Sequence, residues 1–187
     1  MTLGEVARAL EPGAKLHGEF APGLAAEGWF ESRHMNYPYG VHFAVVRIDR
    51  ETGGVTVERY VVAYDIGKAV NPMLVDGQIT GGVAQGLGGA LFEEFLYDTH
   101  GEPLCVNFAD YAMPTAREIP PVEVLISEDA PSPLNPLGVK GAGEGGANAV
   151  GAAIATAIDD ALGRPGAITQ LPVTPQRLRE ILRGNGS

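Results

Sequence analysis

The spacing of hydrophobic residues changes along the chain, and each change predicts a different element. Apolar residues recur with helical spacing over 2–10, where Thr2 is a suitable N-cap. Residues 11–40 show no sustained period and predict extended structure and loops. β-branched and aromatic residues then dominate 41–48 and 55–64, and a turn containing two glycines separates them, which predicts a hairpin. A third strand is expected over 121–127.

Helix start and stop signals predict three more helices. An Asn–Pro pair at 71–72 is a favourable helix start, and the helical pattern continues to about residue 97. Residues 145–162 are rich in alanine and end at a glycine, and a Thr–Pro pair at 174–175 opens a short terminal helix. Because helices and strands are mixed without a repeating βαβ order, the predicted fold class is α+β, with mixed helices and short antiparallel strands.

Composition and charge exclude several classes of function. The chain has 187 residues, 45% of them hydrophobic, and is long enough to bury a core. Its net charge of −10 would repel a phosphate backbone, so we expect no nucleic-acid partner. An export signal and an apolar run of about eighteen residues are both missing from the sequence, which predicts a cytoplasmic chain without membrane insertion. A single cysteine, Cys105, excludes an internal disulfide and a Cys-rich iron–sulfur or zinc site.

The helix that starts at Pro72 is unusually rich in glycine. Each glycine costs roughly 0.5–1 kcal/mol relative to alanine, so a compensating contact is expected. Four small residues spaced i, i+4, i+7 and i+11 form one stripe without side chains, with Gln78 beside it: Gly77, Gly81, Ala84 and Gly88. A flat ligand or another backbone could lie along this stripe. Close helix packing alone is the alternative, and the spacing by itself favours it.

A lone carboxylate embedded in glycine is the second candidate for chemistry. Glu144 follows Gly143 and precedes Gly145 and Gly146, so no neighbouring side chain shields it. It is expected at the start of the alanine-rich helix, where the N-terminal partial positive charge favours the anionic form, whereas burial would raise the pKa. A carboxylate held in this way could serve as a general base. Alternatively, Glu144 only satisfies the N-terminus of the helix.

The segment 141–146 also matches the dinucleotide-binding pattern Gly-x-Gly-x-x-Gly before a helix. That fingerprint should follow directly on a strand, but three prolines occupy the approach, at 131, 133 and 136. A second strand ending in an acidic residue about twenty positions later is not predicted either. A nicotinamide-binding protein is therefore the less favoured alternative.

Four ordered blocks of sequence resemble one enzyme family. The chain is similar to the C-terminal part of the molybdenum subunit of the xanthine dehydrogenase, aldehyde oxidase and carbon monoxide dehydrogenase family. The blocks include VVAYDIGKAVNPMLVDGQITGG and NPLGVKGAGEGGANAVGAA, and they occupy 61–98, 107–124, 135–163 and 171–182. The resemblance implies one molybdenum-cofactor-binding domain fragment over 1–187, with a family-like core at 39–182 and a less distinctive segment at 1–38.

The resemblance also implies roles for individual residues. Glu144 matches the glutamate that acts as general base towards a hydroxyl on molybdenum, and Gln78 matches a glutamine that hydrogen-bonds the pterin. A loop that runs past the cofactor corresponds to Lys140, Gly141, Ala142 and Gly143. The pterin sulfurs hold the metal in that family, so no metal-ligating side chain is expected here. The four histidines, at 17, 34, 42 and 100, lack metal-ligand spacing and are interpreted as structural or solvated.

The implied enzyme is a hydroxylase that inserts water-derived oxygen into a carbon of a small aldehyde or N-heterocycle. It would use molybdopterin, with the cytosine dinucleotide form as one option, and partner chains or domains would carry iron–sulfur clusters and FAD. Other cofactor-binding segments of the family would precede Met1, so the chain is expected to be inactive without that portion. A non-catalytic or vestigial assembly module is the main alternative.

Overall fold

The computed structural model describes residues 1–14, 16, 19–20, 23–32 and 34–184, and it divides the chain into two units. The first unit, Met1–Arg33, contains the helix α1 (Leu3–Ala9), which has no buried residue. Thr2 caps this helix because its side chain accepts a hydrogen bond from the Glu5 amide, and Glu5 reaches back to the Thr2 amide. The helix predicted over 2–10 is confirmed.

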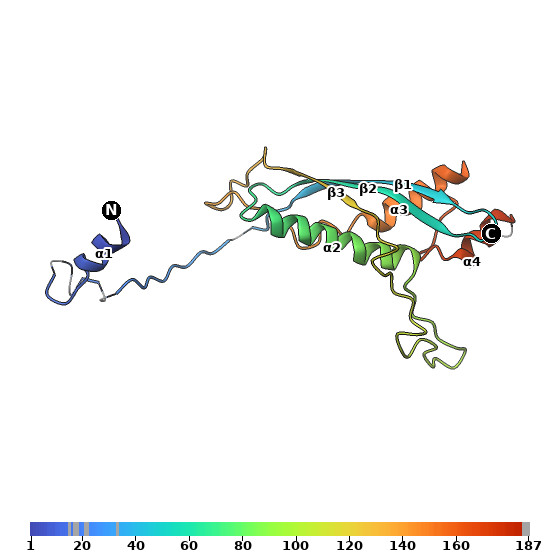
Figure 1. Ribbon diagram of the computed structural model, residues 1–187, viewed down its shortest axis with the longest axis horizontal. Helices are drawn as coiled ribbons and strands as arrows, with labels where there is room; N and C mark the ends of the chain where they lie inside the picture. Colours follow the sequence, from blue (N-terminus) through green and yellow to red (C-terminus); the bar gives the residue numbers. More distant parts are fainter. Residues whose placement is uncertain (15, 17–18, 21–22, 33, 185–187) are drawn as a thin grey trace. The chain divides into compact units, whose positions relative to one another are not determined.

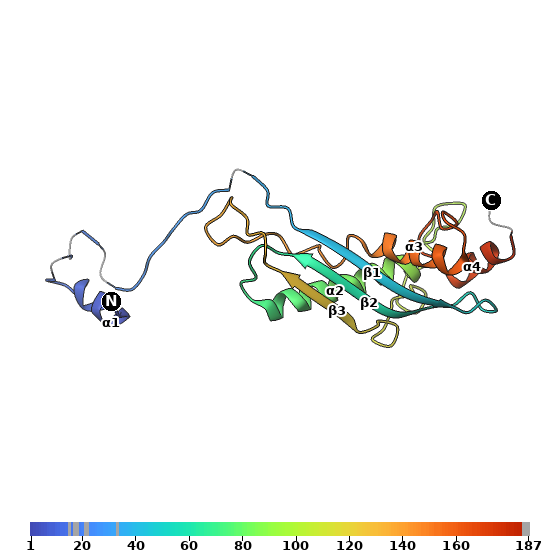
Figure 2. The same cartoon turned by 90° about the horizontal axis from the view of Figure 1, so that it is seen from above.

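The second unit, His34–Ser187, contains a three-stranded sheet in the order β1-β2-β3. The predicted hairpin is confirmed as β1 (Tyr39–Ile48) and β2 (Val55–Asp65), which pair antiparallel. β3 (Val122–Ser127) pairs with β2 in parallel, so the expectation of only antiparallel strands is wrong for β3 (Figure 2). A connection that contains the helix α2 (Pro72–Leu91) carries the chain back before β3 begins, and parallel pairing requires such a long crossover.

Two helix boundaries differ from the prediction. α2 ends at Leu91 and does not continue to residue 97. The acidic residues just after it, Glu93 and Glu94, contact parts of the chain outside this helix. Glu93 accepts a hydrogen bond from the Tyr111 hydroxyl, and Glu94 forms an ion pair with Arg177. The helix α3 (Val150–Leu162) begins five residues later than predicted, because 144–149 form turns that press closely on neighbouring elements. The short terminal helix α4 (Pro175–Leu182) has the predicted Thr174 cap.

The core lies between the sheet and the helices α2 and α3, which both lie on one side of it (Figure 1). Side chains from all of these elements are fully or almost fully buried there, including Tyr60, Val62, Ile79, Val83, Leu87, Ile154 and Ile158. The other face of the sheet carries large apolar side chains that are 51–72% exposed: Tyr39, Val41, Phe43, Val45 and Leu125. The sheet is therefore covered on one face and bare on the other. None of the helices in the described ranges is long and apolar enough to span a membrane.

Candidate functional site

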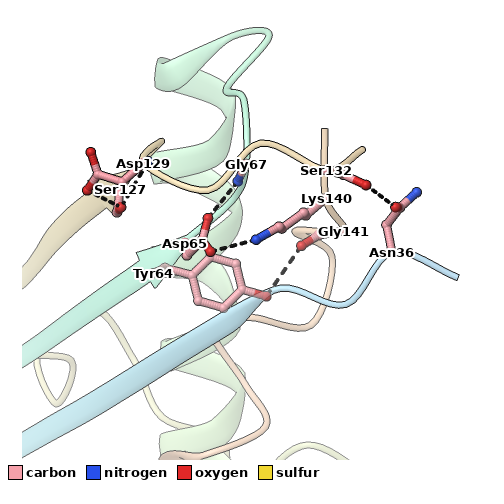
Figure 3. A network of polar contacts seen from close by, with 9 residues as sticks. All are labelled: Asn36, Tyr64, Asp65, Gly67, Ser127, Asp129, Ser132, Lys140 and Gly141. Atoms are coloured by element: carbon pink, nitrogen blue, oxygen red, sulfur yellow. Dashed lines mark hydrogen bonds and ion pairs between the residues drawn. The ribbon is translucent and has the colours of Figure 1, made fainter. Parts of the chain in front are cut away.

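The loop between β3 and α3 is fixed to the end of β2 by Lys140. Its Nζ lies 2.6 Å from an Asp65 carboxylate oxygen, and both side chains are largely buried, at 11% and 19% exposed. The Lys140 amide also donates to the Ile66 carbonyl. The hydrogen bond from Lys140, followed by one from the Gly67 amide, lowers the pKa of Asp65. Figure 3 shows the Lys140 side chain directed at Asp65, so this candidate offers a ligand its backbone only.

Tyr64 of β2 also contacts this loop. A Cβ added to Gly145 would lie 2.2 Å from Cζ of this ring, and one added to Gly40 would lie 2.4 Å from Cδ2, so the ring is held between two glycines. The hydroxyl donates to the Gly141 carbonyl at 3.4 Å. Burial raises the pKa of Tyr64, and the nearby charge of Glu144 raises it further. The phenol therefore remains a hydrogen-bond donor at neutral pH.

His42 of β1 contacts the loop on the carboxyl side of Glu144. Its Nε2 lies 2.9 Å from the Gly145 carbonyl oxygen, and its Nδ1 lies 2.9 Å from the hydroxyl of Tyr60. Tyr60 is completely buried, and this burial raises the pKa of its phenol. Burial also lowers the pKa of His42, with the Gly145 hydrogen bond acting in the opposite direction. The sheet thus contacts the Glu144 loop through the His42 imidazole.

On the other side of Glu144, α2 contacts the loop through Gln78. Its side-chain amide nitrogen donates to the Gly143 carbonyl at 2.8 Å. No group in the described part of the chain donates to its Oε1. Gln78 and the Glu144 loop, two features that lie far apart in the sequence, are therefore neighbours in space.

The glycines of α2 do not form the single open stripe that their spacing suggests. A Cβ at Gly77 or Gly81 would have no neighbour within 4 Å, so these two positions are open. A Cβ at Gly88 would collide with the Glu93 side chain. A different pair faces the start of α3: a Cβ at Gly82 would lie 2.9 Å from the Gly146 backbone, and one at Gly86 would lie 2.6 Å from the Val150 side chain. Close packing thus explains part of the glycine content, and the open pair requires another explanation.

Glu144 itself is exposed and lies between two hollows of the surface. One hollow has an aromatic wall, with lining residues that include Met35, Tyr37, His42 and Tyr64. The other combines bare helix backbone with amide side chains, including Gly77, Gln78, Gly81, Gln85 and Asn148. Because α3 begins only at Val150, the expected position of Glu144 at the mouth of that helix is wrong. A carboxylate between two hollows can accept a proton from a ligand held in either.

In the rest of the predicted cofactor loop, exposed and half-buried residues alternate. Gly141 and Gly143 are exposed, whereas Ala142 is half-buried and packs against the core. Within the described ranges no three His, Cys, Asp or Glu side chains are grouped closely enough to hold a metal ion. His17 lies outside the described residues, so its interpretation stays a prediction.

The sequence did not single out His42, Tyr60 or Tyr64. One signal was available for His42, since it occupies an inward position of β1 that alternates with exposed apolar residues. A polar residue on the core side of a strand requires a partner. The identity of that partner, more than 100 positions away in the chain, cannot be read from strand periodicity.

Comparisons with known proteins agree on one family. The family model for the molybdopterin cofactor-binding domain matches residues 1–120. The chain is 44% identical over 184 residues to the gamma subunit of the 6-hydroxypseudooxynicotine dehydrogenase complex of Paenarthrobacter nicotinovorans, covering 98% of this chain and 23% of that protein. It is 40% identical to the large subunit of nicotine 6-hydroxylase from the same organism, covering 88% of this chain and 20% of that protein.

Solved structures give the same result for the fold. CO dehydrogenase from Oligotropha carboxidovorans superimposes with a TM-score of 0.89 and 32% sequence identity, covering 100% of this chain and 23% of that chain. This chain thus spans less than a quarter of the length of these relatives. The match includes the Glu144 loop, which lies beyond the residues that the family model matches.

Proposed function

The chain belongs to the molybdopterin cofactor-binding domain family, and from this premise we propose that it forms one wall of the active site of a molybdenum hydroxylase, with Glu144 as the general base. The observation that carries the proposal is the position of Glu144 between two hollows of different chemistry, beside Gln78. The runner-up, a non-catalytic assembly module, needs no carboxylate between two ligand-sized hollows.

The residues of the amide-lined hollow fit a pterin. A flat, polar ring system can lie against Gly77 and Gly81, because a Cβ there would meet open space. Gln78 Oε1 can accept a hydrogen bond from it, and the exposed backbone of Gly143, which lines the same hollow, is accessible to its polar atoms. Gly141 lines the aromatic hollow. When bound, the molybdenum cofactor would supply the two-electron oxidation, and its own sulfurs would hold the metal.

The aromatic hollow is the proposed substrate side. Tyr37, His42 and Tyr64 give this hollow the aromatic lining that a planar ring prefers. The two Paenarthrobacter relatives carry names that refer to nicotine compounds, so we favour an N-heterocycle over an aldehyde as the substrate class. Glu144 would take a proton from the water-derived oxygen as this oxygen bonds to a ring carbon. The C–H bond of that carbon would break, and its hydrogen would leave with the electron pair that the bound cofactor accepts. The two electrons would leave through iron–sulfur clusters and FAD on partner chains.

The bare face of the sheet is the surface that we propose the rest of the molybdenum-binding polypeptide covers. Val41 pairs with Ala63, which pairs with Leu125, so the exposed apolar side chains form one continuous patch across three strands. Contiguous apolar surface of this kind usually marks an interface. The relatives are more than four times longer than the matched span, which gives the additional polypeptide that such a face needs.

Replacement of Glu144 tests the proposed base. In the enzyme assembled by coexpression with the remaining molybdenum-binding portion and its partners, Glu144→Gln keeps the shape of the side chain but removes its basicity. We expect unchanged molybdenum and pterin content and a loss of about 10²–10⁴-fold in the rate of substrate-driven reduction. Asp160→Asn, which removes an exposed carboxylate of α3, is the matched control and should leave that rate unchanged.

Unchanged turnover in Glu144→Gln would remove the base assignment. A wild-type assembly that contains neither molybdenum nor pterin would favour the non-catalytic module. If the two portions of the molybdenum-binding polypeptide do not copurify, the bare sheet face is not their interface.

A further inference from the structure

We propose that His42 is a positioning residue for Glu144, acting as a neutral imidazole whose Nε2 proton ties the carbonyl after the base to the sheet. The role of Glu144 comes from the function proposed above, but the hydrogen bonds that carry this inference do not depend on it. The residues before and after Glu144 each have their carbonyl held by one side chain. Gln78 of α2 donates to the Gly143 carbonyl at 2.8 Å, and His42 of β1 holds the Gly145 carbonyl at 2.9 Å.

The loop needs such support because of its composition. Glycines before and after Glu144 leave the backbone with more conformational freedom than any other residue would. The Glu144 carbonyl accepts hydrogen bonds from the amides of Ala147 and Asn148, which fix the turn that follows. Gln78 holds the peptide group that joins Gly143 to Glu144, and His42 holds the peptide group between Gly145 and Gly146, so the backbone is fixed on both sides of the carboxylate.

The partners of His42 determine its tautomer. A carbonyl oxygen only accepts, so the Nε2 that faces Gly145 must carry the proton. Nδ1 of a neutral imidazole is then an acceptor, and the Tyr60 hydroxyl donates to it. Tyr60 is completely buried, and no other partner for its hydroxyl exists among the described residues. A proton on Nδ1 would leave the hydroxyl proton of Tyr60 without an acceptor, so the neutral form with the proton on Nε2 satisfies every group.

The neighbours of His42 support the same assignment. Three tyrosines and Glu144 are the titratable groups that line this region with it or contact it: Tyr37, Tyr60 and Tyr64. The rings of His42 and Tyr60 meet edge to face, with centroids 5.7 Å apart, so the imidazole packs on a core side chain as well as bonding to it. The contact between sheet and loop is therefore anchored in the core.

Three variants of the assembled enzyme test this role. His42→Ala removes the donor to Gly145, and a base displaced by about 1 Å can cost on the order of 100-fold in rate. We expect kcat to fall 10- to 100-fold, and KM should rise as well, because the imidazole belongs to the aromatic lining of the proposed substrate hollow. His42→Gln keeps an amide N–H at a position similar to Nε2 and should recover most of the lost kcat. Recovery of kcat without recovery of KM in His42→Gln is therefore the readout of positioning. His100→Ala, in an exposed turn, is the matched control and should behave as the wild type.

Hydrogen–deuterium exchange with mass spectrometry separates positioning from loss of fold. In His42→Ala, exchange should rise in the peptide covering 143–149 and stay unchanged in 55–65 and 150–162, and His42→Gln should restore the protection. If exchange rises throughout the sheet, or if kcat and loop exchange are unchanged in His42→Ala, the proposal is wrong. Should Glu144→Gln retain full turnover, the base role fails, but the exchange data still decide whether His42 fixes the loop.

Tyr60→Phe tests the tautomer. Without the hydroxyl that donates to Nδ1, the neutral form loses a stabilising hydrogen bond, so the pKa of His42 should rise above its wild-type value. Exchange at the imidazole C2 position, followed by mass spectrometry across pH, measures this pKa in a large assembly. A pKa that is unchanged or lower in Tyr60→Phe would overturn the assignment of Tyr60 as donor.

Discussion

The two sides of α2 use the same residue type for different purposes. On the closed side, Gly82 and Gly86 let the turn before α3 and the first residue of α3 approach so closely that an added Cβ would lie 2.9 Å or less from their atoms. On the open side, a Cβ added to Gly77 or Gly81 would have no neighbouring atom within 4 Å. The first pair is explained by the packing of this chain on itself. No contact within the described residues explains the second pair, which the proposed function assigns to the surface that faces the cofactor.

The largest effect is expected on the closed side. Gly82→Leu would force a branched side chain into the backbone of Gly146, and neither element can move without disturbing the core between α2 and α3. Overpacking of this kind costs about 1–3 kcal/mol or more. We expect a fall of about 3 kcal/mol in the free energy of unfolding, or no soluble protein, measured by urea denaturation. A variant as stable as the wild type would show that the two sides of α2 are not different.

The adjacent residue should give a different result. Gly81→Leu places the same side chain in open space, so the free energy of unfolding should stay the same or rise by up to about 1 kcal/mol through better helix propensity. In the assembled enzyme, the leucine would occupy the surface proposed for the pterin, and the molybdenum and pterin content should fall at least tenfold. Full cofactor content in this variant would mean that the open side does not contact the cofactor.

The sequence predicts local features well. The caps at Thr2, Asn71 and Thr174 depend on hydrogen bonds to amides within three positions, and the left-handed Gly163 that ends α3 needs only its own backbone freedom. The α+β class followed from the same signals. These elements were correct because the interactions that define them are short in sequence.

The errors have a common physical cause. α2 ends early because Glu94 pairs with Arg177, more than 80 positions away, and α3 begins late because Gly146 packs on the backbone of Ile79. The periodicity of a single segment contains no record of such contacts. The candidate site follows the same rule: the glycine neighbours of Glu144 and the family resemblance suffice to propose it from the sequence, whereas His42 is proposed only because of the carbonyl that it contacts.

The smallest expected effect is a change in the free energy of unfolding that should have opposite signs on the two sides of α2. Gly77→Ala adds one methyl group to an open position inside a helix, where alanine is favoured over glycine by roughly 0.5–1 kcal/mol. The free energy of unfolding should therefore rise by about that amount. Gly82→Ala gains the same propensity but brings its methyl group to 2.9 Å from a backbone that is fixed by the core, so its unfolding free energy should fall. Parallel urea denaturation of the two variants measures both changes. If both have the same sign, helix propensity alone determines the cost of glycine in α2, and the surroundings of each face do not contribute.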